Sequence, residues 1–319
     1  MKEECSSKKI MIIGGAGFIG SHLADLCQEK GYETFIYDNF STGKESHLRK
    51  IPNSNIIKGD ILDSQNLCNV MDKINPECVF HLAAIHHIPT CEKEPLKSLR
   101  VNVEGTMSVL SSSSKVKKII FTSTGALYDP AYHKALKEDS PLKTSDIYSI
   151  SKMACENLLE YWAKKNGVPV IAARLFNTVG RRETNRHLIP DVLDQLIEGK
   201  REIRLGNLTP LRDYIHVEDV ADALIALLNL QIAKEYEVFN VGTGIEYSVL
   251  DLVNLFSQVI GEQIKAVSVS ELQRKIDRPT QRADATKLRT LTNWEPKRTL
   301  QQALKEVWEE ARDKRKNVE

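Results

Sequence analysis

Residues 10–20, IMIIGGAGFIG, decide the fold of this chain. Their first four residues form an apolar run that leads into a glycine-rich turn, and an apolar helical pattern starts directly after it. Gly15, Gly17 and Gly20 fit the spacing G-x-G-x-x-G, while Gly14, Gly17 and Gly20 fit G-x-x-G-x-x-G. A strand that passes through such a turn into a helix is the context in which glycines at this spacing indicate a dinucleotide site.

The glycines have separate physical roles in such a site. A tight turn needs positive φ, a pyrophosphate needs backbone without a nearby Cβ, and the helix start supplies N–H groups and its dipole. We therefore expect the pyrophosphate to lie against Gly14, Gly17 and Gly20. The first helical residues, Phe18 and Ile19, would face it with their backbone.

Acidic residues follow the next two predicted strands. Asp38 closes the second strand, 18 residues after Gly20. A carboxylate there accepts hydrogen bonds from the 2′-hydroxyl of the adenosine ribose and repels a 2′-phosphate, which favours NAD over NADP. Asn39 follows it. Asp60 and Ile61, after the third strand, either contact the adenine edge or form an ordinary turn.

The first half of the chain alternates apolar strands with helical patterns. Near-continuous apolar strands suit a parallel sheet that is buried on both faces. The predicted strands are Lys9–Ile13, Tyr32–Tyr37, Asn55–Lys58, Cys78–Leu82, Lys118–Thr122 and Val168–Leu175. The predicted helices between them are Ser21–Lys30, Pro95–Ser113 and Ile147–Asn166. This order predicts an α/β fold with a Rossmann-type, doubly wound parallel sheet.

The pattern changes after Phe176, where helices are joined by short strands and loops. The predicted helices of this half are Leu188–Glu198, Val217–Leu230, Val249–Ile260 and Leu300–Arg312. We expect residues 1–176 to form an NAD-binding Rossmann domain to which residues 213–243 return. Residues 177–212 and 244–319 would form a smaller, mixed C-terminal lobe that binds the substrate.

Composition excludes several classes of protein. The 44 basic and 43 acidic residues leave a net charge of +1, which argues against a dedicated nucleic-acid or membrane-surface protein. No apolar run approaches the roughly 20 residues of a membrane span, and the polar start lacks the apolar core of a signal peptide. The six cysteines show no CxxC spacing, so we expect reduced thiols in a cytoplasmic protein and no metal site.

Tyr148 and Lys152 stand four residues apart, on one face of a predicted helix. A phenol with a pKa near 10 is a poor base at neutral pH, but a neighbouring ammonium and a nicotinamide cation stabilise the phenolate. Lys152 would also bind the nicotinamide ribose. Thr124 lies at the end of an earlier strand, which faces the cofactor crevice. Its hydroxyl either bonds the reacting sugar hydroxyl or caps the next segment.

Several motifs occur in one order along the chain: GGAGFIG, DNFSTGK (38–44), HLAA (81–84), VNVEGT (101–106), the Ser/Thr strand end and YxxxK. Together they resemble the extended short-chain dehydrogenase/reductase family, in particular its nucleotide-sugar epimerases and dehydratases. The resemblance implies that Thr124, Tyr148 and Lys152 are the catalytic residues. It also implies that Ala83 lines the nicotinamide and that Asn102 supports the active-site helix and its water, beside the cofactor.

The second half carries further matches to the family. Asn177, in RLFNTVG (174–180), would meet the sugar diphosphate. Arg212, in a segment that reads RDYIHVEDV, is the first candidate for the diphosphate because a guanidinium fork pairs two phosphate oxygens. Arg278 is the second candidate, and either arginine is otherwise a solvated surface charge. The chain departs from the family at Asp129, where glycine is usual.

The resemblance also implies a reaction: Tyr148 removes a proton from a sugar hydroxyl, usually on C4, and a 4-keto sugar forms transiently. Dehydratases of the family carry an Asp-Glu pair where this chain has Gly125 and Ala126, which have no group to transfer a proton. Together with the 38–44 stretch, this favours an NAD-dependent nucleotide-sugar 4-epimerase.

Other outcomes stay open at this point. A 4-reductase, a dehydratase that uses a different base, and a non-catalytic NAD-binding regulatory protein are the alternatives. As family members commonly do, the chain would form a homodimer through the helices Pro95–Ser113 and Ile147–Asn166.

Overall fold

A computed structural model describes residues 8–184, 187–273 and 278–316, and these divide into two compact units. Unit 1 comprises the described residues up to Leu127, Thr144–Arg174 and Ala221–Phe239. Unit 2 comprises Tyr128–Lys143, Leu175–Val220 and the described residues from Asn240 on. The predicted division into a cofactor domain and a substrate lobe has different bounds and stays a prediction.

Unit 1 is built on a seven-stranded sheet with the order β10-β6-β5-β4-β1-β2-β3. The strands are β1 (Lys9–Ile13), β2 (Glu33–Asp38), β3 (Ile56–Lys58), β4 (Cys78–His81), β5 (Lys118–Thr124), β6 (Val170–Leu175) and β10 (Tyr236–Val241). The pairs β1·β2, β1·β4, β2·β3 and β4·β5 are parallel. The predicted parallel, doubly wound sheet is therefore confirmed.

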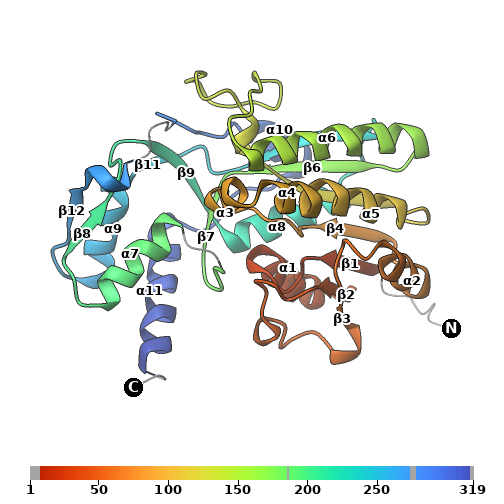
Figure 1. Cartoon of the computed structure of the whole chain (residues 1–319), viewed down its shortest axis with the longest axis horizontal. Helices are drawn as coiled ribbons and strands as arrows, with labels where there is room; N and C mark the ends of the chain where they lie inside the picture. Colours follow the sequence, from red (N-terminus) through yellow and green to blue (C-terminus); the bar gives the residue numbers. More distant parts are fainter. Residues whose placement is uncertain (1–7, 185–186, 274–277, 317–319) are drawn as a thin grey trace. The chain divides into compact units, whose positions relative to one another are not determined.

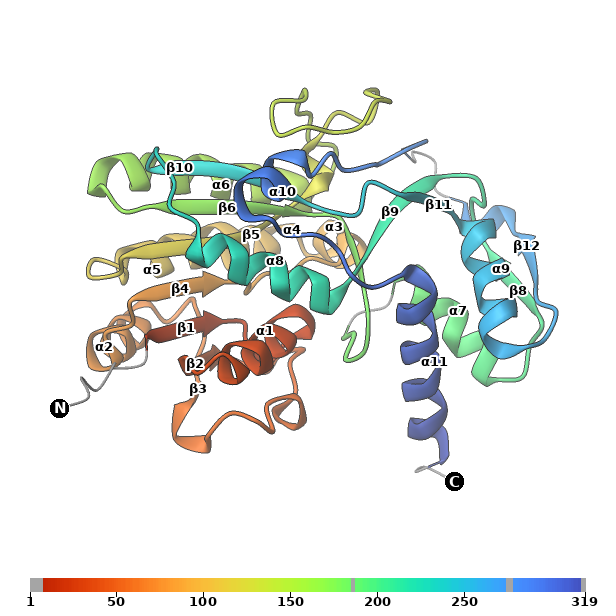
Figure 2. The same ribbon diagram turned by 180° about the vertical axis from the view of Figure 1, so that it is seen from behind.

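Helices cover both faces of this sheet. Figure 1 shows α4, α5 and α6 in front of it, and Figure 2 shows α1 and α8 on the opposite face. The helices of unit 1 are α1 (Phe18–Glu29), α2 (Ser64–Ile74), α3 (Ile88–Lys93), α4 (Pro95–Leu99), α5 (Gly105–Ser111), α6 (Ile147–Asn166) and most of α8 (Val217–Asn229). Apolar side chains of α2, α5 and α6, among them Met71, Val109 and Leu159, pack with Met11 and Phe121 of the sheet. Strands buried on both faces explain why their sequences are almost continuously apolar.

The predicted helix Pro95–Ser113 is interrupted by a turn of π-helix, Arg100–Glu104. Two helices, α2 and α3, were not predicted from the sequence. The N-terminus of α2 is capped by the Asp63 carboxylate, which accepts from the N–H of Asn66. The predicted bounds of α6 and α9 (Val249–Ile260), in contrast, match the structure.

Unit 2 contains two small sheets and a helical layer. One sheet has the order β11-β9-β7, with β7 parallel and β11 antiparallel to β9, and the other pairs β12 with β8. The strands are β7 (Asn177–Val179), β8 (Glu202–Leu205), β9 (Leu211–His216), β11 (Glu246–Ser248) and β12 (Lys265–Ser268); the helices are α7 (Leu188–Ile197), α9, α10 (Thr286–Thr292) and α11 (Leu300–Lys316). Val192, Phe256 and Leu304 are buried in its core. The smaller, mixed part of the predicted fold is thus present.

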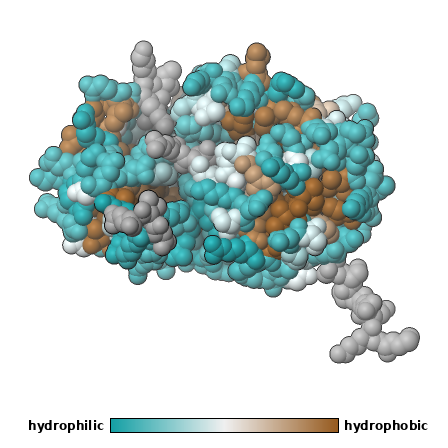
Figure 3. All heavy atoms as spheres, turned by 60° about the horizontal axis from the view of Figure 1, so that its bottom comes forward, coloured by the Kyte–Doolittle hydropathy of each residue, from teal (hydrophilic) through white to brown (hydrophobic). Residues whose placement is uncertain are grey.

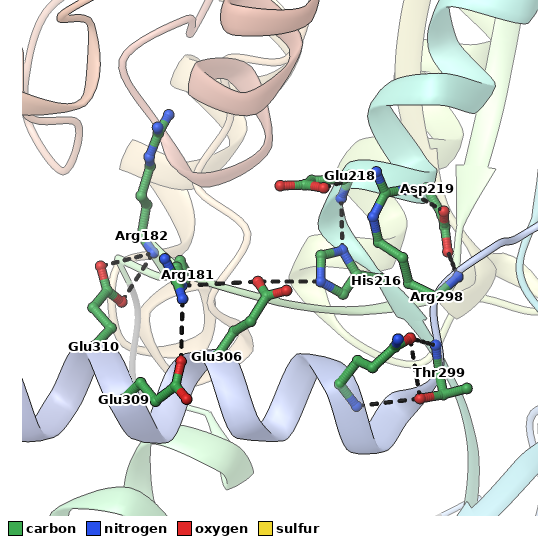
Figure 4. Close-up of polar contacts among 11 residues, drawn as sticks. Arg181, Arg182, His216, Glu218, Asp219, Arg298, Thr299, Glu306, Glu309 and Glu310 are labelled. Atoms are coloured by element: carbon green, nitrogen blue, oxygen red, sulfur yellow. Dashed lines mark hydrogen bonds and ion pairs between the residues drawn. The ribbon is translucent and has the colours of Figure 1, made fainter.

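Charged side chains hold α11 against the rest of unit 2 (Figure 4). Nε2 of buried His216, at the end of β9, lies 3.4 Å from Glu306, and Arg181 lies 3.4 Å from Glu309. Before the helix begins, Arg298 donates to the Asp219 carboxylate at 2.6 Å. Since Asp219 is fully buried, this ion pair fixes the chain segment that leads into α11.

Hydrophilic residues cover much of the face shown in Figure 3, with hydrophobic residues in patches between them. No helix in the described part of the chain is both long and apolar enough to span a membrane. The five cysteines within the described residues are free thiols, and four of them are buried. Cys5 lies outside the described residues.

Candidate active site

The glycines of the turn after β1 differ in their surroundings. Two of them lie tightly against the protein backbone, and the third has open space where its Cβ would be. Gly14 has φ +84°, and a Cβ there would lie 2.6 Å from the backbone nitrogen of Ala83. A Cβ on Gly20 would lie 2.2 Å from the carbonyl oxygen of Gly14. A Cβ on Gly17, however, would meet no protein atom closer than 3.4 Å. The first two glycines are therefore required by packing, whereas the missing Cβ at Gly17 leaves room for something outside the chain.

The start of α1 suits an anion. Gly17 is its N-cap in extended conformation, no side chain caps the first turn, and no acidic residue lies in that turn. The backbone N–H groups of Phe18 and Ile19 belong to the set that an α-helix leaves without intrahelical partners. Together with the helix dipole, they make this turn fit for a pyrophosphate.

Asp38 and Asp60 are organised by backbone contacts. The Asp38 carboxylate accepts hydrogen bonds from the N–H groups of Ala16, at 2.9 Å, and Phe40, at 2.8 Å. Burial raises the pKa of Asp38, and these two bonds lower it. The Asp60 carboxylate accepts from the Asn39 amide, at 2.9 Å, and from a backbone N–H. Since each carboxylate oxygen has two lone pairs, both side chains keep capacity for a ribose or an adenine.

Ile61, next to Asp60, is buried and packs in the core of unit 1. Its side chain lies beneath Gly105, where an added Cβ would come within 2.4 Å of it. Ile61 therefore supports the floor of this region by packing.

Asn102 connects the loop after β4 to the active-site helix. Its amide oxygen accepts from the N–H of Ile85 at 2.8 Å, and its amide nitrogen donates to the Ile85 carbonyl and the Ser151 hydroxyl, each at 2.9 Å. It is 2% exposed. These contacts give Asn102 a supporting position beside α6, next to the strand end that carries Ala83.

The three predicted catalytic residues come together in unit 1. Tyr148 lies in the first turn of α6, and the side chain of Thr124, at the end of β5, is close enough to act on the pKa of its phenol. The Thr124 hydroxyl oxygen also accepts from the N–H of Ala126 at 3.1 Å. Because that bond uses an oxygen lone pair, the hydroxyl hydrogen of Thr124 can donate to a phenolate.

Burial sets the protonation of this site. It raises the pKa of Tyr148 above its ordinary value, and the Thr124 side chain opposes this shift. It lowers the pKa of Lys152 to about 8. The Lys152 ammonium donates to the Thr122 carbonyl at 2.8 Å and lies 4.3 Å from the centre of the Phe121 ring.

The local sequence explains where α6, the helix that carries Tyr148 and Lys152, begins and ends. Asp146 and Ser149 form a capping box at its N-terminus, and Gly167 ends it in the left-handed conformation, with φ +66°. Glu156, further along α6, was not predicted as a site residue; it is 5% exposed and forms an ion pair with Arg174 at 2.7 Å. The sequence does contain a signal for Glu156, because it follows Lys152 by four residues, as Lys152 follows Tyr148.

Unit 2 contains three of the four predicted substrate-binding residues, Asn177, Arg212 and Arg278, whereas Thr124 lies in unit 1. The Asn177 amide donates to the carbonyl of Asp213 in β9 at 3.2 Å. Next to it in β9, Arg212 donates to the carbonyl of Arg278 at 2.7 Å, and Arg278 donates to the carbonyl of Tyr128 at 2.7 Å. Both arginines are half-buried, which differs from the alternative of solvated surface charges.

Two aspartates have structural roles in unit 2. Asp129, the departure from the family pattern, accepts from the N–H of Ala131 at 2.9 Å and so forms a local turn. Fully buried Asp213 accepts from the N–H groups of Thr243, Gly244 and Ala283. Neither needs a ligand to explain its position.

Comparisons with known proteins agree with this geometry. A family model described as NAD dependent epimerase/dehydratase family matches residues 10–242. UDP-glucose 4-epimerase of Lactobacillus helveticus is 31% identical over 309 residues, which cover 91% of this chain and 92% of that protein.

Solved structures show the same likeness. The crystal structure of UDP-glucose 4-epimerase from Thermotoga maritima, with UDP-glucose, has a TM-score of 0.86 and 30% identity, and covers 98% of this chain and 100% of that one. UDP-glucose 4-epimerase from Brucella ovis, in complex with NAD, has a TM-score of 0.87 and 27% identity, and covers 96% and 98%. The family that the ordered motifs resemble is confirmed, and so is NAD, the cofactor predicted from the glycine-rich turn and Asp38. The chain belongs to the NAD dependent epimerase/dehydratase family.

Proposed function

We propose that the chain is a UDP-sugar 4-epimerase that oxidises the C4 hydroxyl of the sugar to a ketone and reduces it again on the opposite face. The observation that carries this proposal is the grouping of three residues: Thr124, at the end of β5, acts on the phenol of Tyr148, and buried Lys152 follows Tyr148 one turn later in α6. The named relatives support the uridine nucleotide, since those described above act on UDP-glucose.

Tyr148 serves as the base in this proposal. NAD, when bound, supplies the acceptor for the hydride and a positively charged ring. The phenolate oxygen of Tyr148 takes the proton of the C4 hydroxyl and later returns it to the reduced sugar. Thr124 donates to the phenolate or to the sugar oxygen, and the Lys152 ammonium favours the phenolate form through its charge.

Each unit has its own candidate binding residues. Gly14, Gly17 and Gly20 would hold the pyrophosphate of NAD, with the backbone of Phe18 and Ile19. The side chains that would hold the rest of the cofactor are Asp38, Asn39, Asp60, Ile61, Ala83, Asn102, Tyr148 and Lys152. In unit 2, Asn177, Arg212 and Arg278 would bind the diphosphate of the sugar nucleotide, because guanidinium groups pair with phosphate oxygens.

The segment after Thr124 favours epimerisation over dehydration. Gly125 and Ala126 form a short 3₁₀ turn and have no side-chain group that exchanges protons. Loss of water from the sugar needs such a group, whereas return of the hydride to the opposite face needs none.

The test is proton NMR of the purified protein with UDP-, dTDP- and GDP-hexoses and uronic acids, without added cofactor. We expect a slow approach to a two-epimer equilibrium with a UDP-sugar and no net formation of NADH. A requirement for added NADPH, or a dehydrated product, would replace the epimerase with a reductase or a dehydratase.

We also propose a cytoplasmic homodimer that has no nucleic-acid or membrane partner. Apolar side chains of α4, α5 and α6 are exposed in unit 1, namely Leu96, Met107, Ile150 and Tyr161. Light scattering at micromolar concentration should give twice the chain mass, and Ile150→Glu should give a monomer. Leu250→Glu on α9 is the control, since Leu250 is 47% exposed and Ile150 is 44% exposed. A wild-type monomer would contradict the dimer.

A further inference from the structure

A buried ion pair follows the catalytic residues along α6. We call Ser123, Glu156 and Arg174 the Glu156 clamp. The Ser123 hydroxyl donates to Oε1 of Glu156 at 2.5 Å. The Arg174 guanidinium donates to Oε1 at 3.0 Å and to Oε2 at 2.7 Å, and both side chains of the pair are nearly inaccessible to solvent.

The clamp joins three elements that build the site. Glu156 comes from α6, Ser123 from β5 and Arg174 from β6. Ser123 directly precedes Thr124, the last residue of β5, whose side chain acts on the pKa of Tyr148. The clamp therefore binds the helix that carries the base to the strand that ends in Thr124.

Spacing places the clamp in register with the catalytic residues. Tyr148, Lys152 and Glu156 follow each other at intervals of four, so they lie on one face of α6, one turn apart. A two-bond guanidinium fork fixes both distance and orientation, because a rotation or a slip of the helix breaks the parallel bonds. The single hydrogen bond from Lys152 to the Thr122 carbonyl restrains the orientation of α6 less than this fork does.

Stability alone does not account for this arrangement. Desolvation of two charges often cancels the attraction of a buried ion pair, and apolar side chains of similar size are often as stable. We propose that the Glu156 clamp is a positioning device, which fixes the face of α6 with Tyr148 and Lys152 against the end of β5. This inference rests on the proposed function, because it assigns the clamp to the step in which Tyr148 takes the proton.

The surroundings of Lys152 provide a readout that a merely structural role would not change. The groups that act on Lys152 are Cys91 of α3, Cys155 and Glu156 of α6, and His81 of β4. Burial raises the pKa of both thiols and lowers the pKa of His81 to about 3, so these three are neutral at neutral pH. Glu156 carries a negative charge and raises the pKa of Lys152.

Two variants separate the charge of the clamp from its geometry. Glu156→Gln removes the charge, while Arg174→Lys keeps all charges and loses the fork. Glu160→Gln is the matched control, because Glu160 lies one turn further along α6 in an exposed ion pair with Lys164. The measurements are kcat, KM and NAD content over a range of pH, with far-ultraviolet circular dichroism to confirm folding.

We expect kcat of Glu156→Gln to fall roughly ten- to a hundredfold, the scale on which a misplacement of about 1 Å acts. KM for the UDP-sugar and the NAD content should stay near wild-type values. The alkaline limb of its pH profile should move to lower pH, since Lys152 then loses its proton more easily. Arg174→Lys should lose kcat without a shift of that limb, and Glu160→Gln should match the wild type.

Wild-type kcat in Arg174→Lys, or a fall in kcat of Glu156→Gln without the shift of its alkaline limb, would overturn the proposal. Failure of the proposed function would look different, because the wild-type chain itself would not convert any UDP-sugar. In that case, NMR titration of the Lys152 side chain, assigned with Lys152→Met, still tests the clamp without substrate. An unchanged pKa of Lys152 in Glu156→Gln would overturn the electrostatic part as well.

Discussion

Alanine at Gly17 or at Gly20 should separate cofactor binding from folding, although the two glycines lie in one turn. A Cβ on Gly20 would lie 2.2 Å from a backbone carbonyl oxygen, so α1 must move by roughly 1 Å to restore a normal contact. Overpacking of this kind costs about 1–3 kcal/mol, and the better helix propensity of alanine returns about 1 kcal/mol. Since the neighbour is backbone and cannot rotate away, we expect a net loss near the upper end, about 2 kcal/mol.

Gly17→Ala should behave differently. Its Cβ meets no protein atom closer than 3.4 Å, and its φ of −73° is open to any residue. Replacement of a glycine N-cap by alanine costs about 1 kcal/mol at most, so the fold should persist. The Cβ would, however, occupy the space in which a pyrophosphate approaches the backbone, and bound NAD should be lost.

The assay is urea unfolding of both variants after removal of NAD, together with the NAD content of each protein as purified. Wild-type NAD content in Gly17→Ala would refute the placement of the pyrophosphate at this turn. Equal losses of unfolding free energy in the two variants would refute the steric distinction between the two glycines.

Three further substitutions test the rest of the site. Tyr148→Phe should lower turnover by about 10²–10⁴-fold while NAD stays bound, and full activity would remove Tyr148 from its role as base. Lys152→Met should inactivate the enzyme yet raise the unfolding free energy of the NAD-free protein at neutral pH. The pKa of Lys152 is about 8 when folded against an ordinary 10.5, so the unfolded chain binds more protons in this window and wild-type stability rises from pH 8 to 10.5. Denaturant titrations at several pH values should therefore show the advantage of Lys152→Met shrink across that window. Arg212→Met should raise KM for the UDP-sugar about tenfold or more without loss of NAD. An unchanged KM would show that Arg212 does not bind the diphosphate.

Elements with strong local signals could be predicted from the sequence, and α6 is the clearest case. Its C-terminal glycine marks the end, and Asp146 with Ser149 caps the start, so predicted and observed bounds agree. The short helix α2 buries only Leu67 and Met71 along its length. So few buried positions give little helical periodicity, although the Asp63 cap that starts this helix was readable.

The π-turn Arg100–Glu104 could not be predicted, because its cause lies outside the segment. Its residue Asn102 bonds Ile85 and Ser151, which belong to a loop and a helix distant in the sequence. The Thr106 hydroxyl and the Cys155 thiol both donate to the Asn102 carbonyl, at 2.6 and 3.1 Å. Tertiary contacts of this kind override the regular helical pattern that the segment carries by itself.

In the candidate site, too, residues with a local sequence signal could be predicted, whereas contacts made through the tertiary structure could not. Spacing and residue type were enough to select Tyr148, Lys152 and Thr124, since their chemistry is specific. The sequence did not reveal the partners that hold them, such as the carbonyl of Thr122 and the carboxylate of Glu156, because a backbone acceptor has no signature and Glu156 needs Arg174 from another strand.

Burial alone would make Tyr148 a poor base at neutral pH. The site must therefore supply positive charge that stabilises its phenolate. Burial raises the pKa of the Tyr148 phenol and lowers the pKa of the Lys152 ammonium, so both groups are driven toward their neutral forms. A buried phenolate forms only where positive charge compensates it. The Glu156 carboxylate raises the pKa of Lys152 and so retains one such charge, and a cationic cofactor ring would add the second. Proton transfer at Tyr148 should thus depend on cofactor binding, and a chain without NAD should leave sugar hydroxyls untouched.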